Sequence, residues 1–356
     1  MNAGARKVIV RGLSDIGIVR EENEDSLAIK EPEDVAVRKD KGILVALADG
    51  MGGLADGATA SRLAVEKIVE AYYRGREPPA LALERAVKEA NREIFLCSRA
   101  SATSASMGST VTALAVLEGQ AWVGQVGDSR AYCYRDGTLH QITRDHSLVR
   151  ELVDMGQIEE SSPHYAFHRN VLTRGLGLRE DVAVDIYELR ELEPGDRIVL
   201  TSDGLHEIVH QQEMVVCLEK FGTDLDGACR ELVGIATSRG APDNITVAIV
   251  CITTEDGSLG GARAPSSRRE TLVLGLAKPR FEAGWLLPLA VFLAFAAGVF
   301  LTLFVEAPPL LPPDAVKRLE AEVDSALDPA SQPPGDAERA ARLRESLEMI
   351  REILGK

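Results

Sequence analysis

The sequence predicts an α+β domain over residues 1–253, in which sheets and helices form separate layers. Two observations predict this fold class. Short apolar runs follow one another through hairpin-like turns, of which Asp136-Gly137 is the clearest. Amphipathic helical patterns come in pairs between these runs of sequential strands. This order favours a layered α+β domain over a βαβ Rossmann fold, in which strands and helices would alternate.

The individual elements follow from the spacing of apolar residues. Strands are expected at residues 6–13, 43–48, 109–117, 120–127, 129–135, 182–189, 196–202 and 245–253. Helices are expected at residues 56–74, 79–99, 146–155, 211–221 and 224–239. In the first of these helices, Leu63, Ile68 and their apolar neighbours recur at helical spacing. The sequence contains no internal repeat.

Composition excludes some classes of protein. The chain has 356 residues, of which 45% are hydrophobic and 27% charged, as in globular proteins. Its formal net charge of −15, without a sustained basic stripe, argues against nucleic acid as a partner. The five cysteines are odd in number and form no C-x-x-C pair, so we expect buried thiols in a reducing compartment. The N-terminus has basic residues but no apolar run after them, so no signal peptide is expected.

The composition changes after residue 253. Residues 254–284 are rich in Gly, Ser, Pro and Arg and are expected to form a flexible linker. Residues 285–305 contain no charge over 21 positions, which predicts a single transmembrane helix. An apolar helix docked on the domain is the alternative. Residues 306–356 begin with a Pro-rich spacer and contain two short amphipathic patterns, at 314–327 and 336–354, whose partner the sequence does not identify.

Charge around the predicted span indicates its orientation. Five basic residues precede it, namely Arg263, Arg268, Arg269, Lys278 and Arg280. After it, the first basic residue is Lys317. Positive charge near a span stays on the cytoplasmic side. The sequence therefore predicts a single-pass protein of the inner membrane with residues 1–282 in the cytoplasm and 306–356 outside.

Acidic residues recur at the ends of the expected strands. Strand-like runs lead into Asp49, Asp128 and Asp203, Asp243 stands just ahead of another strand, and the pair Glu24-Asp25 closes "REENED". A single aspartate at such a place is usually a turn or a helix cap. Several of them at the ends of neighbouring strands would converge, and converging carboxylates repel one another unless cations lie between them. Acids without His or Cys nearby favour Mg²⁺ or Mn²⁺ over zinc.

A site of this kind supports the attack of a metal-activated water on phosphorus. A phosphate also needs a fixed cation, and Arg20 stands four and five residues before the acidic pair. Its planar guanidinium can hold two phosphoryl oxygens, whereas a lysine would supply only a point charge. An arginine among acids is otherwise a surface ion pair, and the predicted metal site is what favours the phosphate-binding role.

The motifs, taken together, resemble a known family. "SDIGIVREENED", "ADGMGG", "GST", "VGDSRAY", "RDHSL", "RNVLTRGLG", "LTSDGL" and "APDNITV" stand in the order and spacing of the bacterial metal-dependent Ser/Thr protein phosphatases of type 2C. The resemblance covers residues 6–253. It implies a four-layer α-β-β-α sandwich with two Mn²⁺ or Mg²⁺ ions at one end of the central pair of sheets.

The resemblance also implies roles for individual residues. Asp49 would bridge the two ions, and Gly50 would contribute its backbone carbonyl. Asp203 and Asp243 would complete the ligands, and Arg20 matches the phosphate-binding arginine.

Further residues match outer positions of the family's site. Glu24 and Asp25 would hold metal-bound waters or ligate directly, and Asn244 would orient the aspartate before it. Asp128, together with Asp203, matches the position of a weaker third ion in bacterial members.

The sequence departs from the family at one position. Bacterial members commonly have a histidine after "DGMGG", a residue linked to protonation of the leaving group or to substrate binding, and this chain has Leu54 there. The general acid is therefore not assigned, and a metal-bound water is an alternative. Residues 146–172 correspond to the family's flap beside the active site. The sequence of this flap does not identify the phosphoprotein substrate.

The resulting hypothesis is a membrane-anchored phosphatase that removes phosphate from phosphoserine and phosphothreonine and opposes Ser/Thr kinases. Two alternatives remain at this level. One is a pseudophosphatase or scaffold that binds kinases or phosphoproteins without turnover. The other is a sensor in which the tail outside the membrane receives the signal and the phosphatase domain is the output. A metallonuclease would share the acidic residues but not the order of the motifs.

Overall fold

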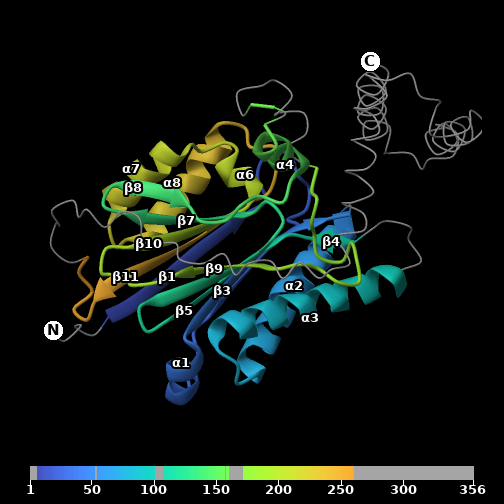
Figure 1. Cartoon of the computed structure of the whole chain (residues 1–356). Helices are drawn as coiled ribbons and strands as arrows, with labels where there is room; N and C mark the ends of the chain where they lie inside the picture. Colours follow the sequence, from blue (N-terminus) through green and yellow to red (C-terminus); the bar gives the residue numbers. More distant parts are fainter. Residues whose placement is uncertain (1–5, 53, 101–106, 157, 160–170, 260–356) are drawn as a thin grey trace, which may run out of the picture. The chain divides into compact units, whose positions relative to one another are not determined.

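Two antiparallel sheets form the centre of the domain (Figure 1). The computed structural model describes residues 6–52, 54–100, 107–156, 158–159 and 171–259. The five-stranded sheet has the order β1 (Arg6–Asp15), β11 (Ile245–Thr254), β10 (Arg197–Thr201), β7 (Arg130–Arg135) and β8 (Thr138–Gln141). The six-stranded sheet has the order β2 (Asp25–Lys30), β3 (Ile43–Met51), β5 (Val111–Leu117), β6 (Gln120–Val126) and β9 (Asp185–Leu189), and β4 (Gly108–Ser109) pairs with β3.

Helices cover the outer face of each sheet. The long helices α2 (Leu54–Arg74) and α3 (Pro79–Ala100) share one buried cluster with the six-stranded sheet. The helices α7 (Gln211–Phe221) and α8 (Leu225–Ser238) share a second cluster with the five-stranded sheet. Among the described residues, shorter helices lie in connections at α1 (Val35–Lys41), α4 (Leu148–Asp154) and α6 (Asp203–His206).

A third apolar cluster fills the space between the two sheets. Val45 and Leu47 of β3, Leu114 of β5, and Ala248 and Val250 of β11 are fully buried members of it. The order of layers is therefore helices, sheet, sheet, helices, which is the four-layer sandwich that the family resemblance implied. Because both faces of the central strands are buried, their sequences are continuous apolar runs instead of alternating ones.

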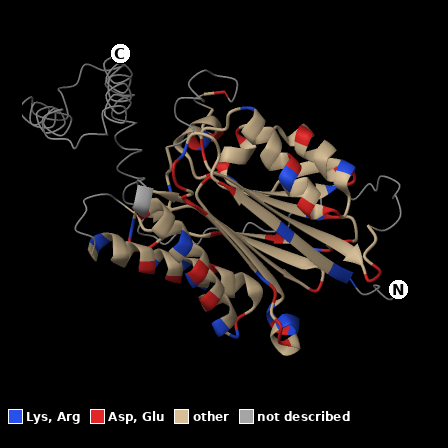
Figure 2. Cartoon of the chain, turned by 180° about the vertical axis from the view of Figure 1, so that it is seen from behind, with Lys and Arg blue, Asp and Glu red and all other residues tan. Residues whose placement is uncertain are grey.

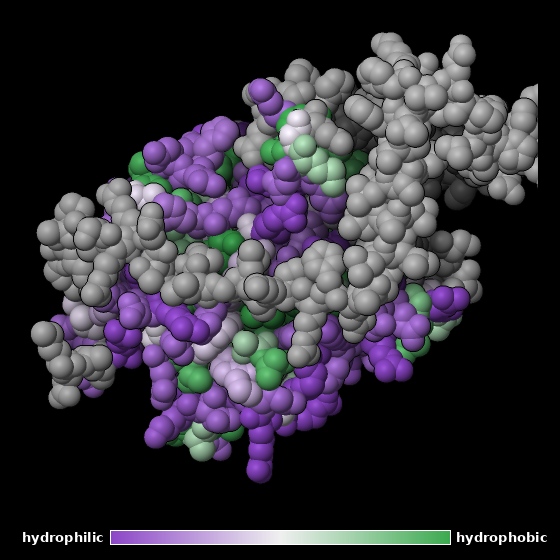
Figure 3. All heavy atoms as spheres, in the orientation of Figure 1, coloured by the Kyte–Doolittle hydropathy of each residue, from purple (hydrophilic) through white to green (hydrophobic). Residues whose placement is uncertain are grey.

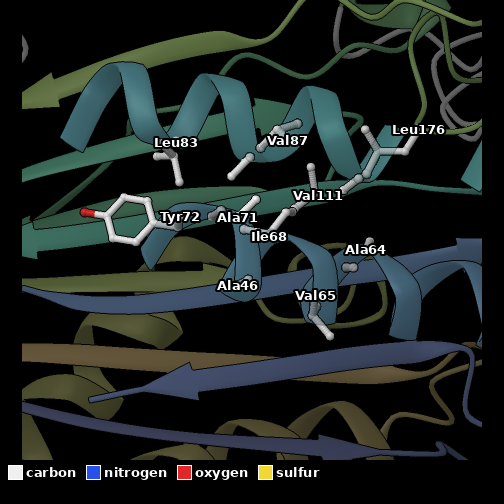
Figure 4. Packing of buried hydrophobic residues seen from close by; sticks show 14 of the residues in the cluster. Ala46, Ala64, Val65, Ile68, Ala71, Tyr72, Leu83, Val87, Val111 and Leu176 are labelled. Carbon is white, nitrogen blue, oxygen red and sulfur yellow. The ribbon is translucent and has the colours of Figure 1, made fainter. Parts of the chain in front are cut away.

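The pair of long helices packs through small and aromatic side chains (Figure 4). Ile68 and Tyr72 on α2 face Leu83 and Val87 on α3, and all four are fully buried. The Tyr72 hydroxyl donates a 2.8 Å hydrogen bond to the Lys41 carbonyl, which satisfies the only polar atom of that side chain. The α2–α3 layer therefore packs on the outer face of the six-stranded sheet, which contains β3.

Most expected elements are confirmed within a few residues. Three described elements were not predicted, namely strand β2 and the helices α1 and α6. The strand expected at 43–48 continues as β3 to Met51, so Asp49 lies inside the strand and not beyond its end. The strand expected from 109 is split at Thr110 into β4 and β5, and the helix expected from 146 begins at Leu148 after its N-cap Ser147.

The predicted linker from residue 260 onward, the span and the tail lie outside the described residues, because these end at residue 259. Among the helices that the structure describes, none is long and apolar enough to cross a membrane. The visible face of the described domain is mostly hydrophilic, with scattered apolar residues (Figure 3). Acidic and basic residues are interspersed along its helices (Figure 2).

Candidate active site

The predicted acidic residues meet at one end of the two sheets. Asp25, the first residue of β2, lies directly opposite Asp49 of β3 in the ladder. Asp203 begins α6 immediately after β10, Asp128 follows β6, and Asp243 stands two residues before β11. Residues from both sheets thus contribute to one acidic cluster. The strand pattern predicted that the acids converge, but at the ends of neighbouring strands of one sheet.

Burial and mutual repulsion perturb this cluster. Burial raises the pKa of Asp49 well above its ordinary value, and the neighbouring charges of Asp25, Asp203 and Asp128 raise it further. The pKa of Asp203 is raised to about 6, first by burial and then by Asp243. Burial is the largest cause of both shifts, and the neighbouring carboxylates add to it, so negative charge is concentrated in this cluster.

Two carboxylate oxygens in the cluster have no hydrogen-bond partner among the residues that the structure describes. Asp203 Oδ1 and Glu24 Oε1 are buried and accept no hydrogen bond within the described part of the chain. Such oxygens are costly unless a cation or donor reaches them. A set of aspartate and glutamate oxygens without histidine or cysteine suits a hard divalent ion.

The acidic side chains are not already arranged around an ion. No three His, Cys, Asp or Glu side chains of the described residues form a group that could hold a metal as placed. Asp243 is instead turned to Arg20, and Asp25 to two hydroxyl groups. The residues therefore fit Mn²⁺ or Mg²⁺ by chemistry and uncompensated charge, and the individual ligand assignments stay predictions.

Asp25 connects the two sheets. Its Oδ2 accepts hydrogen bonds from Ser202 Oγ at 2.8 Å and from Thr246 Oγ1 at 2.6 Å, both of the opposite sheet region. Burial raises the pKa of Asp25 to about 8, although these two hydrogen bonds oppose the shift. The sequence analysis did not identify either hydroxyl group, although Ser202 directly precedes the Asp203 of "TSDGL".

Hydroxyl side chains also hold the backbone of Asp49. The Asp49 amide donates to Thr110 Oγ1 at 3.0 Å, and the Asp49 carbonyl accepts from Ser109 Oγ at 2.9 Å. Thr110 and Ser109 belong to the "GST" motif, whose role was not assigned from sequence. They fix the strand at the point where its carboxylate enters the cluster.

Gly50 lies where the backbone of three segments meets. Its amide donates to the Glu24 carbonyl at 3.1 Å. A Cβ at this position would lie 2.1 Å from the carbonyl oxygen of Gly57 on α2, so no larger residue fits. The glycine permits α2 to approach the acidic cluster closely.

Arg20 faces the cluster from a loop between β1 and β2. Its Nη2 donates to Asp243 Oδ2 at 2.7 Å, and its Nη1 lies 3.4 Å from Glu24 Oε2. The side chain nevertheless remains 42% exposed. Arg20 is therefore oriented by the acids while part of its side chain stays exposed to solvent.

Asn244 holds this loop. Its Oδ1 accepts from the Glu24 amide at 2.8 Å, and its Nδ2 donates to the carbonyls of Ile16 and Glu22 at 2.9 and 3.0 Å. The sequence assigned Asn244 the role of orienting Asp243. In the structure, only the backbone amide of Asn244 contacts Asp243 Oδ1, at 2.8 Å, and its side chain positions the loop that carries Arg20.

The loop that carries Asp128 is held by His146. The Gly127 amide donates to His146 Nδ1 at 3.1 Å, and His146 Nε2 lies 3.0 Å from Asp185 Oδ2. Asp185 also accepts from Arg174 at 2.8 Å. The acceptor role of Nδ1 places the ring proton on Nε2, so His146 acts here as a structural clamp and not as an acid.

Burial raises the pKa of Asp128, and the charge of Asp203 raises it further, so the two carboxyl groups belong to the same electrostatic cluster. A pocket of about 200 Å³ adjoins Asp128 and is lined by Arg130, Asp145, Ser147, Val149, His206 and Glu207.

Together, the four-layer fold, the uncompensated acids and the half-exposed Arg20 define a divalent-metal-dependent hydrolase of phosphate esters.

The comparison with known proteins gives the family. Residues 20–231 match the family model described as protein phosphatase 2C. Over 245 residues the chain is 34% identical to the serine/threonine phosphatase stp of Listeria innocua, covering 67% of this chain and 93% of that protein. The chain therefore belongs to the protein phosphatase 2C family, and it is a metal-dependent protein serine/threonine phosphatase.

Solved structures agree with this assignment. The serine/threonine phosphatase PstP/Ppp of Mycobacterium tuberculosis superposes with a TM-score of 0.59 at 31% identity, covering 68% of this chain and 98% of that one. The catalytic domain of PstP in complex with two manganese ions gives a TM-score of 0.58 at 30% identity, covering 70% of this chain and all of the other. These relatives support a dependence on Mn²⁺ or Mg²⁺.

Proposed function

We propose that this phosphatase hydrolyses phosphoserine and phosphothreonine in proteins and so opposes Ser/Thr kinases. The observation that carries the proposal is the juxtaposition of uncompensated carboxylates with an arginine that stays 42% exposed. Carboxylates alone would repel a phosphate dianion, and the arginine alone would not activate water. Together they would supply a metal site and a cation that binds the phosphate, and both lie at the same end of the sandwich.

The roles proposed for the residues are those that the family resemblance implies, and the placement of the acids at one end of the two sheets supports them. Asp49, Asp203 and Asp243, with the carbonyl of Gly50, would hold two divalent ions, and the bound ions supply an activated water. Asp128 would share a third ion with Asp203.

The remaining residues prepare the site. Arg20 would bind two phosphoryl oxygens and orient the phosphorus toward the acidic cluster. Glu24 and Asp25 would act beside the proposed ligands, holding metal-bound waters or ligating directly. Asp25 is fixed by hydroxyl groups of the other sheet region. Asn244 keeps the arginine loop in place.

The proposal is tested by phosphate release from a phosphothreonine peptide by the full-length chain, with and without Mn²⁺. We expect release that requires the metal, stops with EDTA and is indifferent to thiol-blocking reagents, because four of the five cysteines are buried and none belongs to the proposed site. The expected result also includes a loss of turnover by orders of magnitude in Asp203→Asn. A chain that binds phosphopeptides but releases no phosphate would instead be a scaffold.

Because Leu54 stands where the family commonly has a histidine, no side chain is assigned as the general acid. Leu54 is the first residue of α2, but its side chain lies outside the described residues. The His146 ring is committed to Gly127 and Asp185, which argues against it as a substitute. We propose that a water takes the place of the missing histidine.

We also propose that the chain is anchored in the inner membrane by residues 285–305, with the phosphatase domain in the cytoplasm. The support is the uncharged run of 21 residues and the basic residues before it. ATP-dependent kinases and their phosphoprotein products are in the same compartment. The amphipathic tail at 306–356 would then meet an extracytoplasmic partner.

A further inference from the structure

Three apolar side chains are exposed immediately before Arg20. The exposed fractions are 39% for Ile16, 57% for Ile18 and 65% for Val19. Exposed apolar residues that stand singly are ordinary on protein surfaces. Three within four positions of one loop, next to the arginine that faces the acidic cluster, are an apolar surface beside the phosphate site.

The loop that presents these side chains is fixed to the rest of the site. The Ile18 amide donates to the Ala241 carbonyl at 3.5 Å, and the Ile16 carbonyl accepts from Asn244 Nδ2 at 2.9 Å. Gly17 has φ of +77°, and a Cβ there would lie 2.3 Å from the Asp243 carbonyl oxygen. The backbone therefore holds Ile18 and Val19 in a defined place without using their side chains.

We propose that Ile18 and Val19 contact an apolar residue of the substrate close to its phosphorylated residue. The inference rests on the proposed function, because it takes the phosphate to lie at Arg20. Adjacent Cα atoms are about 3.8 Å apart, and an extended peptide advances about 3.3 Å per residue. The side chains within about three positions of the phosphorylated residue are therefore the candidates for this contact.

The charge next to the apolar surface favours a peptide over a lipid. Glu21 and Glu22, on the other side of Arg20, are both exposed. They would repel the anionic headgroups of a membrane surface. A phosphopeptide meets no such penalty, since its phosphate is neutralised at the site and its neighbouring side chains can be apolar.

The test measures kcat/KM of the full-length chain on a set of phosphothreonine peptides. One parent peptide has serine at every flanking position, and each other peptide places a single leucine at one of the three positions on either side. We expect at least one leucine position to raise kcat/KM about tenfold, as burial of part of one apolar side chain allows. The double variant Ile18→Ser/Val19→Ser should lose this preference.

Two controls separate specificity from catalysis. p-Nitrophenyl phosphate has no flanking residues, so the double variant should hydrolyse it at the rate of the unmodified chain. Val216→Ser changes a side chain of α7 that is 63% exposed and does not belong to the site, and it should keep the leucine preference.

The outcomes are distinguishable. If the unmodified chain with Mn²⁺ releases no phosphate from any substrate, the proposed function fails. If it hydrolyses all peptides but shows no leucine preference, or if the double variant keeps that preference, the apolar contact is refuted and the proposed function stands. An equal loss on p-nitrophenyl phosphate would show that the two side chains serve catalysis and would also refute the contact.

Discussion

At the scale of the residue, the site depends on carboxylates whose charge the protein does not balance. Asp203 shows this most clearly, because one of its oxygens is buried with no hydrogen-bond partner in the part of the chain that the structure describes, and burial raises its pKa to about 6. A carboxyl group in this position favours the folded state only when a cation offsets its charge. The site residues are therefore expected to cost stability in the metal-free protein and to contribute it in the metal-bound protein.

The substitution Asp203→Asn should change stability in opposite directions with and without metal. In the metal-free protein the unfolded carboxyl loses its proton near pH 4, whereas the folded one keeps it to about pH 6. Unfolding then releases a proton, so stability falls as the pH rises through this range. The variant lacks this loss and should be more stable than the unmodified chain at pH 7.5 by roughly 1 to 3 kcal/mol.

In saturating Mg²⁺ the order should reverse, because the variant loses part of the binding free energy of the ion. Chemical denaturation with and without Mg²⁺ at pH 4.5 and 7.5 measures both effects. Asp226→Asn is the matched control, since Asp226 is half-exposed and pairs with Arg11 on the surface. If Asp203→Asn destabilises the protein equally in EDTA and in Mg²⁺, Asp203 is not a metal ligand.

Arg20→Ala should weaken substrate binding more than turnover. The guanidinium would contact the phosphate in both the ground state and the transition state, so its removal raises KM for a phosphothreonine peptide, by about tenfold or more, with a smaller change in kcat. The metal requirement should change little. Steady-state kinetics at several Mn²⁺ concentrations measure both quantities, and an unchanged KM would contradict the phosphate-binding role.

At the scale of the element, the sequence predicted the strands that are buried on both faces. Runs such as "ILVALAD" of β3 and "ITVAIV" of β11 are continuous and apolar, so they stand out from their surroundings. Strand β2, "DSLAIK", is six residues long and contains charges at both ends, so its alternation is easily overlooked. Helix α1 is only seven residues long and has no apolar stripe, and Asp34 as its N-cap is the one signal for it.

The site was predictable to the same limited extent. The acids were expected at strand ends, and the structure brings Asp25, Asp49, Asp128, Asp203 and Asp243 together, although Asp49 lies inside β3. The hydroxyl groups that support them were not predictable in this way. Serine and threonine are common at the ends of strands, and only the approach of the two sheets shows that Ser202 and Thr246 bind Asp25.

The packing of α3 against its sheet provides a test of the helix layer. Leu83 is fully buried there, whereas Leu81, two residues earlier in the same helix, is 57% exposed. Leu83→Ala should cost about 2 to 5 kcal/mol of unfolding free energy, because it removes apolar contacts and leaves a cavity. Leu81→Ala should stay within about 0.5 kcal/mol. Urea denaturation of the two variants measures the difference, and equal effects would contradict the described packing.

At the scale of the whole molecule, the site exists because two sheets pack together. Asp25 and Asp49 belong to the six-stranded sheet, whereas Asp203 and Asp243 flank strands of the five-stranded sheet. Neither sheet alone assembles the acidic cluster. The apolar residues between the sheets therefore position the catalytic acids as well as stabilise the fold, and loss of sheet packing should abolish metal binding and activity together.

The last prediction concerns the location of the whole chain. If residues 285–305 span the inner membrane, the full-length protein should be found in the membrane fraction, and protease added to spheroplasts should remove residues 306–356 while the phosphatase domain survives. This orientation is expected because the basic residues that precede the span favour the cytoplasmic side of the membrane. A chain that ends at residue 259 contains every described element and lacks the span, so it should be found in the soluble fraction. A full-length protein in the soluble fraction would instead favour a helix docked on the domain, and a tail protected from external protease would reverse the proposed orientation.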